Sequence, residues 1–199
     1  IGQQPWAQKV IVGLAGYFNE QTARASLKTL AQSSTELARV KLPLQVAGWY
    51  FPVEIDPTWE GAAVLRDYLK AWPRPLWVSA YDSNNLGPDV LAQRLAEWLP
   101  KDVGVFFQDG VGLHARDATT ALRYTDALVK YLGEARVKMI AEAFRPKVGG
   151  GFRSATAEEL CTQLRAYRRH RVYLFDGPHY VTDTLIDDLT GVTTPSTPW

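Results

Sequence analysis

Six short apolar runs recur along the chain, and helical patterns separate them. The runs are rich in Val, Ile, Leu and aromatic residues and carry few polar positions. Near-continuous apolar runs of this length are typical of strands that are buried on both faces, as in a parallel sheet. The predicted strands are residues 9–15, 44–51, 76–81, 103–107, 137–141 and 171–175.

The segments between the runs have apolar residues at helical spacing, as in residues 59–72, where one face carries Leu65, Tyr68, Leu69 and Trp72. The pattern predicts helices over residues 20–40, 59–72, 88–99, 116–132 and 155–167. Polar residues suited to cap a helix stand near three of the starts, at Asn19, Thr58 and Ser154, and Pro88 suits a first helical turn. Trp72 and Trp98 lie on helix faces and are expected to pack in the core.

Five β–α units followed by a sixth strand predict an α/β protein with a parallel sheet and right-handed crossovers. Either an open doubly wound sheet or a (β/α) barrel satisfies this order. The G-x-G-x-x-G signature of the doubly wound dinucleotide folds is missing, and the glycine run at residues 149–151 is expected to form a flexible loop beside the site. We expect one domain over residues 1–190 and an irregular tail over residues 191–199.

Acids, amides and aromatic residues gather directly after five of the predicted strands. The carboxyl ends of parallel strands share one edge, where the loops converge on a concavity, so these residues predict a site. Glu54 and Glu142 are its central members. The alternative for Glu142 is a structural ion pair with Arg145 or Arg116, and for Glu54 a charge at a helix N-terminus.

Two carboxylates on one rim suit glycoside hydrolysis, in which one is a general acid and the other attacks the anomeric carbon or activates water. A separation of about 5–5.5 Å favours retention of configuration and about 6.5–9.5 Å favours inversion. The residues expected to stack on sugar rings are Trp49, Tyr50, Tyr81 and Tyr180. Those expected to bind hydroxyl groups are Asn84, Gln108, Asp109, Asp176 and His179.

Composition and missing motifs exclude several other classes of function. The formal net charge of +1 gives no global field for nucleic acid, and no stretch is apolar and long enough to span a membrane. The single cysteine, Cys161, excludes an internal disulfide and a cysteine-based metal site. No G-x-S-x-G elbow is present. A metal site built from Asp82, Asp109, Asp176 and His179 is a weaker alternative, and we expect neither a metal nor a cofactor.

Two motifs resemble an uncharacterised family of glycosidase-like TIM barrels, a domain-of-unknown-function family. Residues 48–55 read G-W-Y-F-P-V-E-I, similar to the family's G-W-Y-x-P-x-E-I, and residues 108–112 match its Q-D-G-V-G. The resemblance, which covers about residues 9–180, implies that the six strands are barrel strands three to eight of a partial TIM-type barrel. Its placement of Glu54 after strand four and Glu142 after strand seven is similar to clan A retaining glycoside hydrolases. It therefore implies Glu54 as acid/base and Glu142 as nucleophile.

Three hypotheses follow. The first is a retaining glycoside hydrolase that acts on a polysaccharide or oligosaccharide. The second is a non-catalytic glycan-binding module in polysaccharide export or surface display, suggested by Val53, since clan A enzymes usually carry Asn before this glutamate. The third is an open-sheet protein with a small-molecule ligand and structural glutamates. We expect a periplasmic or extracellular location after removal of an export signal, and an incomplete barrel favours self-association.

Overall fold

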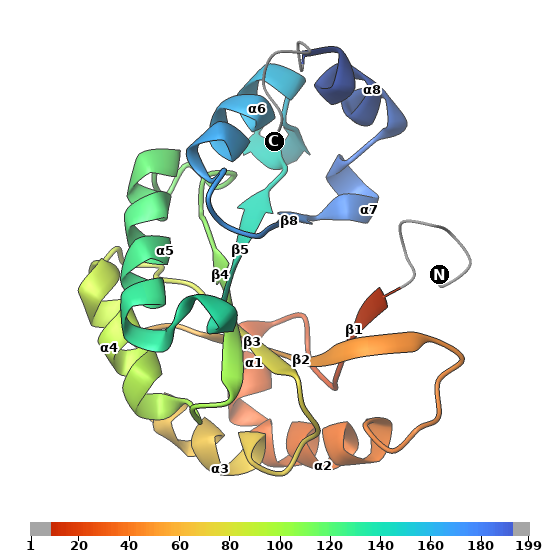
Figure 1. Cartoon of the computed structure of the whole chain (residues 1–199), viewed down its shortest axis with the longest axis vertical. Helices are drawn as coiled ribbons and strands as arrows, with labels where there is room; N and C mark the ends of the chain where they lie inside the picture. The colour runs from red at the N-terminus through yellow and green to blue at the C-terminus, as the bar shows by residue number, and fades with distance from the viewer. Residues whose placement is uncertain (1–8, 193–199) are drawn as a thin grey trace.

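The computed structural model describes residues 9–192, in which six parallel strands curl into a half-barrel (Figure 1). The strand order follows the chain: β1 (Lys9–Gly13), β2 (Gln45–Ile55), β3 (Leu76–Ala80), β4 (Val103–Gln108), β5 (Val137–Glu142) and β8 (Val172–Phe175). The six predicted strands are thus confirmed. A doubly wound sheet reverses its strand order, whereas this sheet does not. The chain is therefore a partial α/β barrel.

Helices cover the outer, convex face of the curled sheet. They are α1 (Glu20–Ala25), α2 (Leu27–Leu37), the 3₁₀ turn η2 (Glu60–Val64), α3 (Leu65–Leu69), α4 (Pro88–Trp98), α5 (Ala118–Leu132) and α6 (Ala157–Ala166). Figure 1 shows α2 to α5 around the outside of the curl. All five predicted helical segments are present, although residues 20–40 form two helices that meet at Ser26.

The capping predictions had mixed outcomes. Asn19 caps α1, since its Oδ1 accepts a hydrogen bond from the Thr22 N–H at 2.9 Å. Thr58 is not the N-cap of η2, because Trp59 holds that place. The prediction for Ser154 is wrong, because this residue pairs with Phe144 in a small hairpin. Instead, α6 begins after a reciprocal capping box that Thr156 forms with Glu159.

Five elements were not predicted, namely β6 (Phe144–Pro146), β7 (Phe152–Ser154), the 3₁₀ turn η3 (Glu134–Arg136), α7 (Gly177–Tyr180) and α8 (Asp183–Val192). The glycine run, with φ between 74° and 103°, forms the loop of the β6–β7 hairpin. Helix α8 extends two residues into the expected tail, and the rest of that tail lies outside the described residues. The single domain over residues 1–190 stays a prediction.

The main core lies between the sheet and its helices. On β2 the fully buried Phe51, Val53 and Ile55 alternate with half-buried residues, so the strand has one helix-covered face. Trp72 and Trp98 pack in this core, as predicted. The other face of β2 turns to the inside of the half-barrel, and Glu54 lies on it.

Aromatic side chains fill the inner, concave face. Trp77 of β3 lies across two glycines, since a Cβ atom at Gly104 would come within 2.2 Å of its ring and one at Gly48 within 3.3 Å. Phe106 of β4 contacts Trp77, Tyr50 and Tyr173, with ring centroids between 5.1 and 5.9 Å apart. These rings form the floor below the carboxyl ends of the strands.

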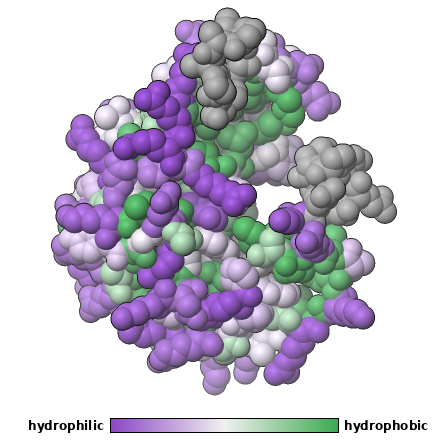
Figure 2. Space-filling model, viewed as in Figure 1, coloured by the Kyte–Doolittle hydropathy of each residue, from purple (hydrophilic) through white to green (hydrophobic). Residues whose placement is uncertain are grey.

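The sheet stays open between its two edge strands. Every residue of β3 is buried, whereas Leu174 and Phe175 of β8 are 37% and 46% exposed. Figure 2 shows a hollow on this open side, with apolar residues at its walls.

Candidate active site

The carboxyl ends of four neighbouring strands bring together four of the predicted site residues. Glu54 is the last residue but one of β2, Tyr81 follows β3, Gln108 ends β4 and Glu142 ends β5. Since β2 to β5 are consecutive and parallel, these side chains share one edge of the inner face. The tertiary structure thus gathers residues that are up to 88 positions apart in the sequence (142 − 54 = 88).

Glu142 is an almost completely buried carboxylate that forms no ion pair among residues 9–192. It is 1% exposed. Its Oε2 accepts a hydrogen bond from the backbone N–H of Leu113 at 3.1 Å. Burial, followed by the charge of Asp109, raises the pKa of Glu142 from 4.5 to about 7. Such a carboxyl group exchanges a proton near neutral pH, which suits chemical catalysis.

The alternative for Glu142, a structural ion pair with Arg145 or Arg116, is not found in the structure. Arg145 donates to the backbone oxygens of Glu142 and Phe144, at 3.1 and 2.7 Å, rather than to the Glu142 carboxylate. Arg116 donates to backbone oxygens and to Asn85. Within residues 9–192, neither Glu142 nor Glu54 belongs to an ion pair. The glutamates are therefore not explained as members of structural ion pairs.

Asp109 is a buried group whose carboxylate is hydrogen-bonded within the protein, and its predicted contact with substrate stays a prediction. It is 0% exposed. Its Oδ1 accepts from the backbone N–H groups of Val111 and Glu142, both at 3.2 Å. Its Oδ2 accepts from the Tyr167 hydroxyl at 2.9 Å and from the Gln163 amide. Burial raises the pKa of Asp109, and the four donors partly offset that effect. Asp109 thereby fixes the main chain at Glu142.

Glu54 is the second glutamate whose pKa is raised to about 7. Its Oε2 accepts a hydrogen bond from the Gln108 side-chain amide. Burial, followed by the charge of Glu20, raises the pKa of Glu54 from 4.5 to about 7, while the Gln108 hydrogen bond and Arg24 act in the opposite direction. Glu54 lies within a strand, so its alternative role as a helix N-terminal charge is wrong. Gln108 orients this carboxylate, and its predicted contact with substrate stays a prediction.

Tyr81 connects the two glutamates electrostatically. After burial and the opposing charge of Arg116, the charges of Glu142 and Glu54 both raise the pKa of the Tyr81 hydroxyl. The Tyr81 ring stacks on the Arg116 guanidinium, whose central carbon is 4.9 Å from the ring centroid. One hydroxyl therefore responds to both carboxylates, which places the two in a common electrostatic environment.

Three of the other predicted ligand residues lie on or after β2 and β3, each in a different environment. Tyr50 lies on the inner face near Glu54, whose charge contributes to the raised pKa of the Tyr50 hydroxyl. Trp49 instead packs against the helix-covered core, away from the carboxylates, which argues against sugar stacking at this position. Asn84 is exposed in the turn after β3.

Three further predicted residues lie after the edge strand β8. Asp176 Oδ2 is 2.6 Å from Nδ1 of the exposed His179. Tyr180 packs against Phe144, with ring centroids 5.1 Å apart and ring planes tilted by 43°. This aromatic group extends to the exposed rings of Phe152 and Phe175. Their role as ligand residues stays a prediction.

Sequence reasoning missed the residues that hold the two glutamates. Glu20 and Arg24 of α1 bind the backbone of Glu54, and the charge of Glu20 acts on its carboxyl group. Gln163 and Tyr167, from α6 and the residue after it, bind Asp109. Glu20, in a first helical turn, and the helical Gln163 look like ordinary solvated residues in the sequence. Because they lie far along the chain from the glutamates, no local sequence pattern indicates that they contact the site.

Metal binding and membrane insertion are two further possibilities that the described residues address. Residues 9–192 contain no group of three or more His, Cys, Asp or Glu side chains that could hold a metal ion, so the weaker metal alternative is not supported. None of the helices described is long and apolar enough to cross a membrane.

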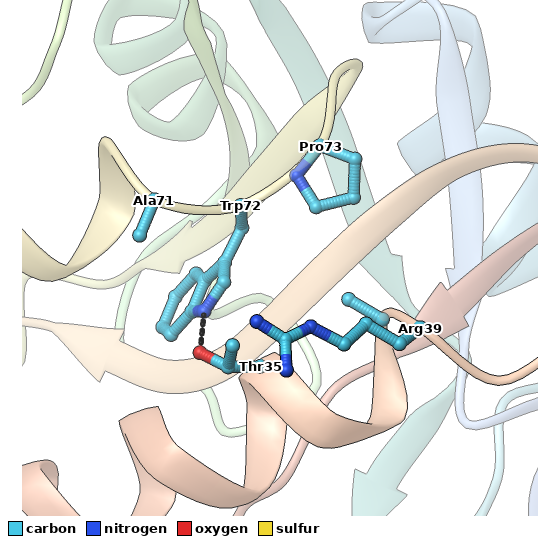
Figure 3. Close-up of a pocket in the computed structure, with 6 residues that line it drawn as sticks. Thr35, Arg39, Ala71, Trp72 and Pro73 are labelled. Atoms are coloured by element: carbon cyan, nitrogen blue, oxygen red, sulfur yellow. Dashed lines mark hydrogen bonds between the residues drawn. The ribbon is translucent and has the colours of Figure 1, made fainter.

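A surface pocket lies at the other end of the strands. It is formed by the C-terminal turn of α2 and the segment before β3, where Trp72 Nε1 donates to Thr35 Oγ1 at 3.1 Å (Figure 3). Its residues immediately precede β2 and β3, so it opens at the amino ends of the strands. In α/β barrels the amino ends contribute to stability, whereas chemistry takes place at the carboxyl ends. The pocket is therefore separate from the candidate active site.

Comparison with known proteins supports the fold. No family model and no curated protein matches the chain. Among solved structures, the chain is similar to a “putative alpha-L-fucosidase” from Bacteroides thetaiotaomicron, with a TM-score of 0.59 and 15% sequence identity over 87% of this chain. The match spans 61% of the length of that protein. At this identity the likeness concerns the fold alone, a partial α/β barrel.

Proposed function

We propose that this protein is a glycoside hydrolase that cleaves a poly- or oligosaccharide with Glu54 and Glu142. One observation carries the proposal: Glu142 is buried and Glu54 half-buried at neighbouring strand ends, neither forms an ion pair among the described residues, and the pKa of each is raised to about 7. Carboxyl groups that are withdrawn from water without an ion-pair partner destabilise a fold, so two of them at one sheet edge point to function. The six strands would then be strands three to eight of a TIM-type barrel.

The surroundings support different roles for the two carboxyl groups. Glu54 has a second carboxylate, Glu20, beside it, which favours its protonated form and suits a general acid. Glu142 accepts from the Leu113 N–H, and both this bond and the charge of Arg116 favour its ionised form. The positive charge that develops on the sugar in the transition state would favour an ionised Glu142 further. Glu142 is therefore assigned as the nucleophile.

The proposed reaction has two steps. In the first, a carboxylate oxygen of Glu142 forms a bond to the anomeric carbon while the glycosidic C–O bond breaks. The electron pair goes to the leaving oxygen, which takes the proton of Glu54. In the second, a water oxygen attacks the anomeric carbon, its proton passes to Glu54, and the bond to Glu142 breaks. The product keeps its anomeric configuration and both glutamates return to their starting forms.

The test is turnover of a panel of glycans and aryl glycosides, fucosides included, by the wild-type protein and by Glu54→Gln and Glu142→Gln. Both variants should lose at least about 100-fold in rate, since each removes a group that acts in the chemical step. Glu97→Gln, at an exposed position on α4, is the matched control and should keep wild-type activity. Unchanged turnover in both active-site variants would refute the proposal. Binding without cleavage would place the protein among glycan-binding modules.

Chemical rescue separates the two roles. With an activated aryl glycoside and azide, Glu142→Ala should give a glycosyl azide of inverted configuration, because azide takes the place of the nucleophile. Glu54→Ala should give one of retained configuration, because azide attacks the glycosyl-enzyme that Glu142 still forms. The reverse pattern would exchange the roles of the two glutamates.

A further inference from the structure

Glu54 lies in an irregular part of β2. Phe51 and Ile55 pair with Val78 and Ala80 of β3, so four steps along β2 match two steps along β3. The pairing of β2 with β1 ends at Tyr50. The irregularity re-aims the end of the strand, as bulges beside active sites often do. The backbone of Glu54 therefore needs hydrogen-bond partners from outside the sheet.

Two side chains of α1 supply these partners. The backbone N–H of Glu54 donates to Glu20 Oε2 at 3.1 Å, and Arg24 Nη2 donates to the backbone oxygen of Glu54 at 2.9 Å. Arg24 is itself held over the Trp59 ring, 5.0 Å from its centroid. Its Nε lies 3.9 Å from Glu20 Oε2, too far for a hydrogen bond. Glu20 and Arg24, which form an ion pair with each other, thus hold the Glu54 backbone from both sides.

The hydrogen bond between the Glu54 N–H and Glu20 places a second carboxylate beside the Glu54 carboxyl group. The charged and titratable groups that face Glu54 are Glu20 and Arg24 from α1, Asp56 from the loop after β2, and the hydroxyls of Tyr50 and Tyr81. Among these, Glu20 has the largest effect on the pKa of Glu54. Burial also raises the pKa of Glu20. Two neighbouring carboxylates resist simultaneous ionisation, so the pair retains a proton.

We propose that Glu20 is the positioning residue of the general acid: it fixes the Glu54 main chain in the bulge and, through its negative charge, keeps the proton on Glu54. The proposal rests on the function proposed above for Glu54. Arg24 opposes the charge of Glu20 and holds the other side of the same peptide. The first α1 turn therefore belongs to the active site, although it follows a different strand from either glutamate.

The test is a carboxyl ¹³C NMR titration of Glu54, which needs no substrate. Glu20→Gln keeps an oxygen that accepts from the Glu54 N–H but removes the charge. Its Glu54 midpoint should fall by about one pH unit, since a like charge in contact commonly shifts a pKa by at least that much. Glu36→Gln makes the same charge change at an exposed position of α2 and should leave the midpoint unchanged. Equal midpoints in all three proteins would overturn the proposal.

The wild-type protein provides a second test that does not depend on a folded variant. The resonances of Glu20 and Glu54 should each show two inflections, because interacting carboxyl groups titrate in coupled steps. Independent single-step curves would contradict the proposal even if Glu20→Gln fails to fold.

Kinetics then separates this proposal from the proposed function. If the protein cleaves glycans, the basic limb of the pH profile of kcat/KM follows the loss of the Glu54 proton, and Glu20→Gln should move that limb to lower pH. A merely structural role for Glu20 would lower the rate at every pH without moving the limb. If no glycan is cleaved but the NMR midpoint shifts, the coupling holds and only the proposed hydrolase function fails.

Discussion

Gly112 and Glu142 are so close that a Cβ atom at position 112 would lie 2.6 Å from the Glu142 Cβ and 2.9 Å from its Oε2. The same atom would lie 2.8 Å from the backbone oxygen of Phe144. The absence of a side chain at Gly112 lets the loop after β4 approach β5 closely enough for Leu113 to donate to Glu142. The second glycine of the Q-D-G-V-G segment thus lies against Glu142, while the first, Gly110, lies against Tyr81 and Arg116.

Gly112→Ala should destabilise the protein by about 1–3 kcal/mol, because one of the three close atoms belongs to the backbone and cannot rotate away. It should also break the Leu113–Glu142 hydrogen bond. Urea denaturation measures the first effect and the ¹⁵N shift of Leu113 the second. Gly13→Ala is the control, since a Cβ there meets nothing within 4 Å, and it should change stability by less than about 1 kcal/mol. Equal effects of the two substitutions would contradict the prediction.

Stability should fall as the pH rises from about 4.5 to above 7. The folded-state pKa of both Glu54 and Glu142 is raised to about 7, so the folded protein binds these two protons more tightly than the unfolded chain does. Their contribution is complete below about pH 4.5 and is lost as the pH passes 7, by up to about 3 kcal/mol per group. Denaturation measured at intervals from pH 4.5 to 8.5 tests this.

Glutamine variants of the two glutamates extend the same denaturation experiment. Glu54→Gln and Glu142→Gln mimic the protonated form, so each should be more stable than wild type at pH 8 while losing activity. Glu159→Gln serves as the opposite control: hydrogen bonds from Arg153 lower the pKa of Glu159 to about 2, so its contribution is lost as the pH falls. A pH-independent effect of Glu142→Gln would show that this group titrates normally.

Asp109→Asn should weaken the fold and shift Glu142. The four groups around Asp109 all donate to it, and the amide nitrogen of an Asn cannot accept from Gln163, whose own oxygen is bound by Arg145. One buried donor is left unsatisfied, at about 1–3 kcal/mol. Removal of the charge should also lower the pKa of Glu142 below 7, since Asp109 raises it. Denaturation and a ¹³C titration of Glu142 check both effects, with the exposed Asp126→Asn as control.

Arg116→Lys should not be a conservative change. The guanidinium lies between the rings of Tyr81 and Tyr124, 4.9 and 4.8 Å from their centroids, and donates to Asn85 and to the backbone oxygen of Asp82. A lysine ammonium group lacks the planar fork that serves these partners together, so a loss of about 1–3 kcal/mol is expected. Arg94→Lys, at an exposed position over Trp98, should lose less than about 1 kcal/mol.

The six strands and five helical segments were predictable because they depend on local patterns. A run such as residues 103–107 reads as a buried strand wherever it lies in the fold, and it is fully buried in the structure. The short hairpin of β6 and β7 was missed, because three-residue strands carry no periodic signal. Asn19 was a correct cap and Ser154 was not, since the hairpin engages Ser154 before the helix begins.

The candidate site was only partly predictable. The position of Glu54 and Glu142 at strand ends follows from the sequence, because parallel strands bring their carboxyl ends to one edge. Asp109 also follows a strand end, yet its carboxylate is buried and accepts hydrogen bonds from Gln163 and Tyr167. Trp49 and Tyr50 are adjacent in the sequence but lie on opposite faces of β2, one toward the helix-covered core and the other toward Phe106.

The sequence by itself determined the alternation of strands and helices and the two glutamates at strand ends, because both depend on the order of residues within short segments. Only the tertiary structure decided which groups surround those glutamates. Glu20 lies 34 residues before Glu54, and Asp109 lies 33 residues before Glu142. The pKa of a carboxyl group depends on burial and on charges within a few ångströms, and the chain acquires those neighbours only when its strands pair and its helices pack.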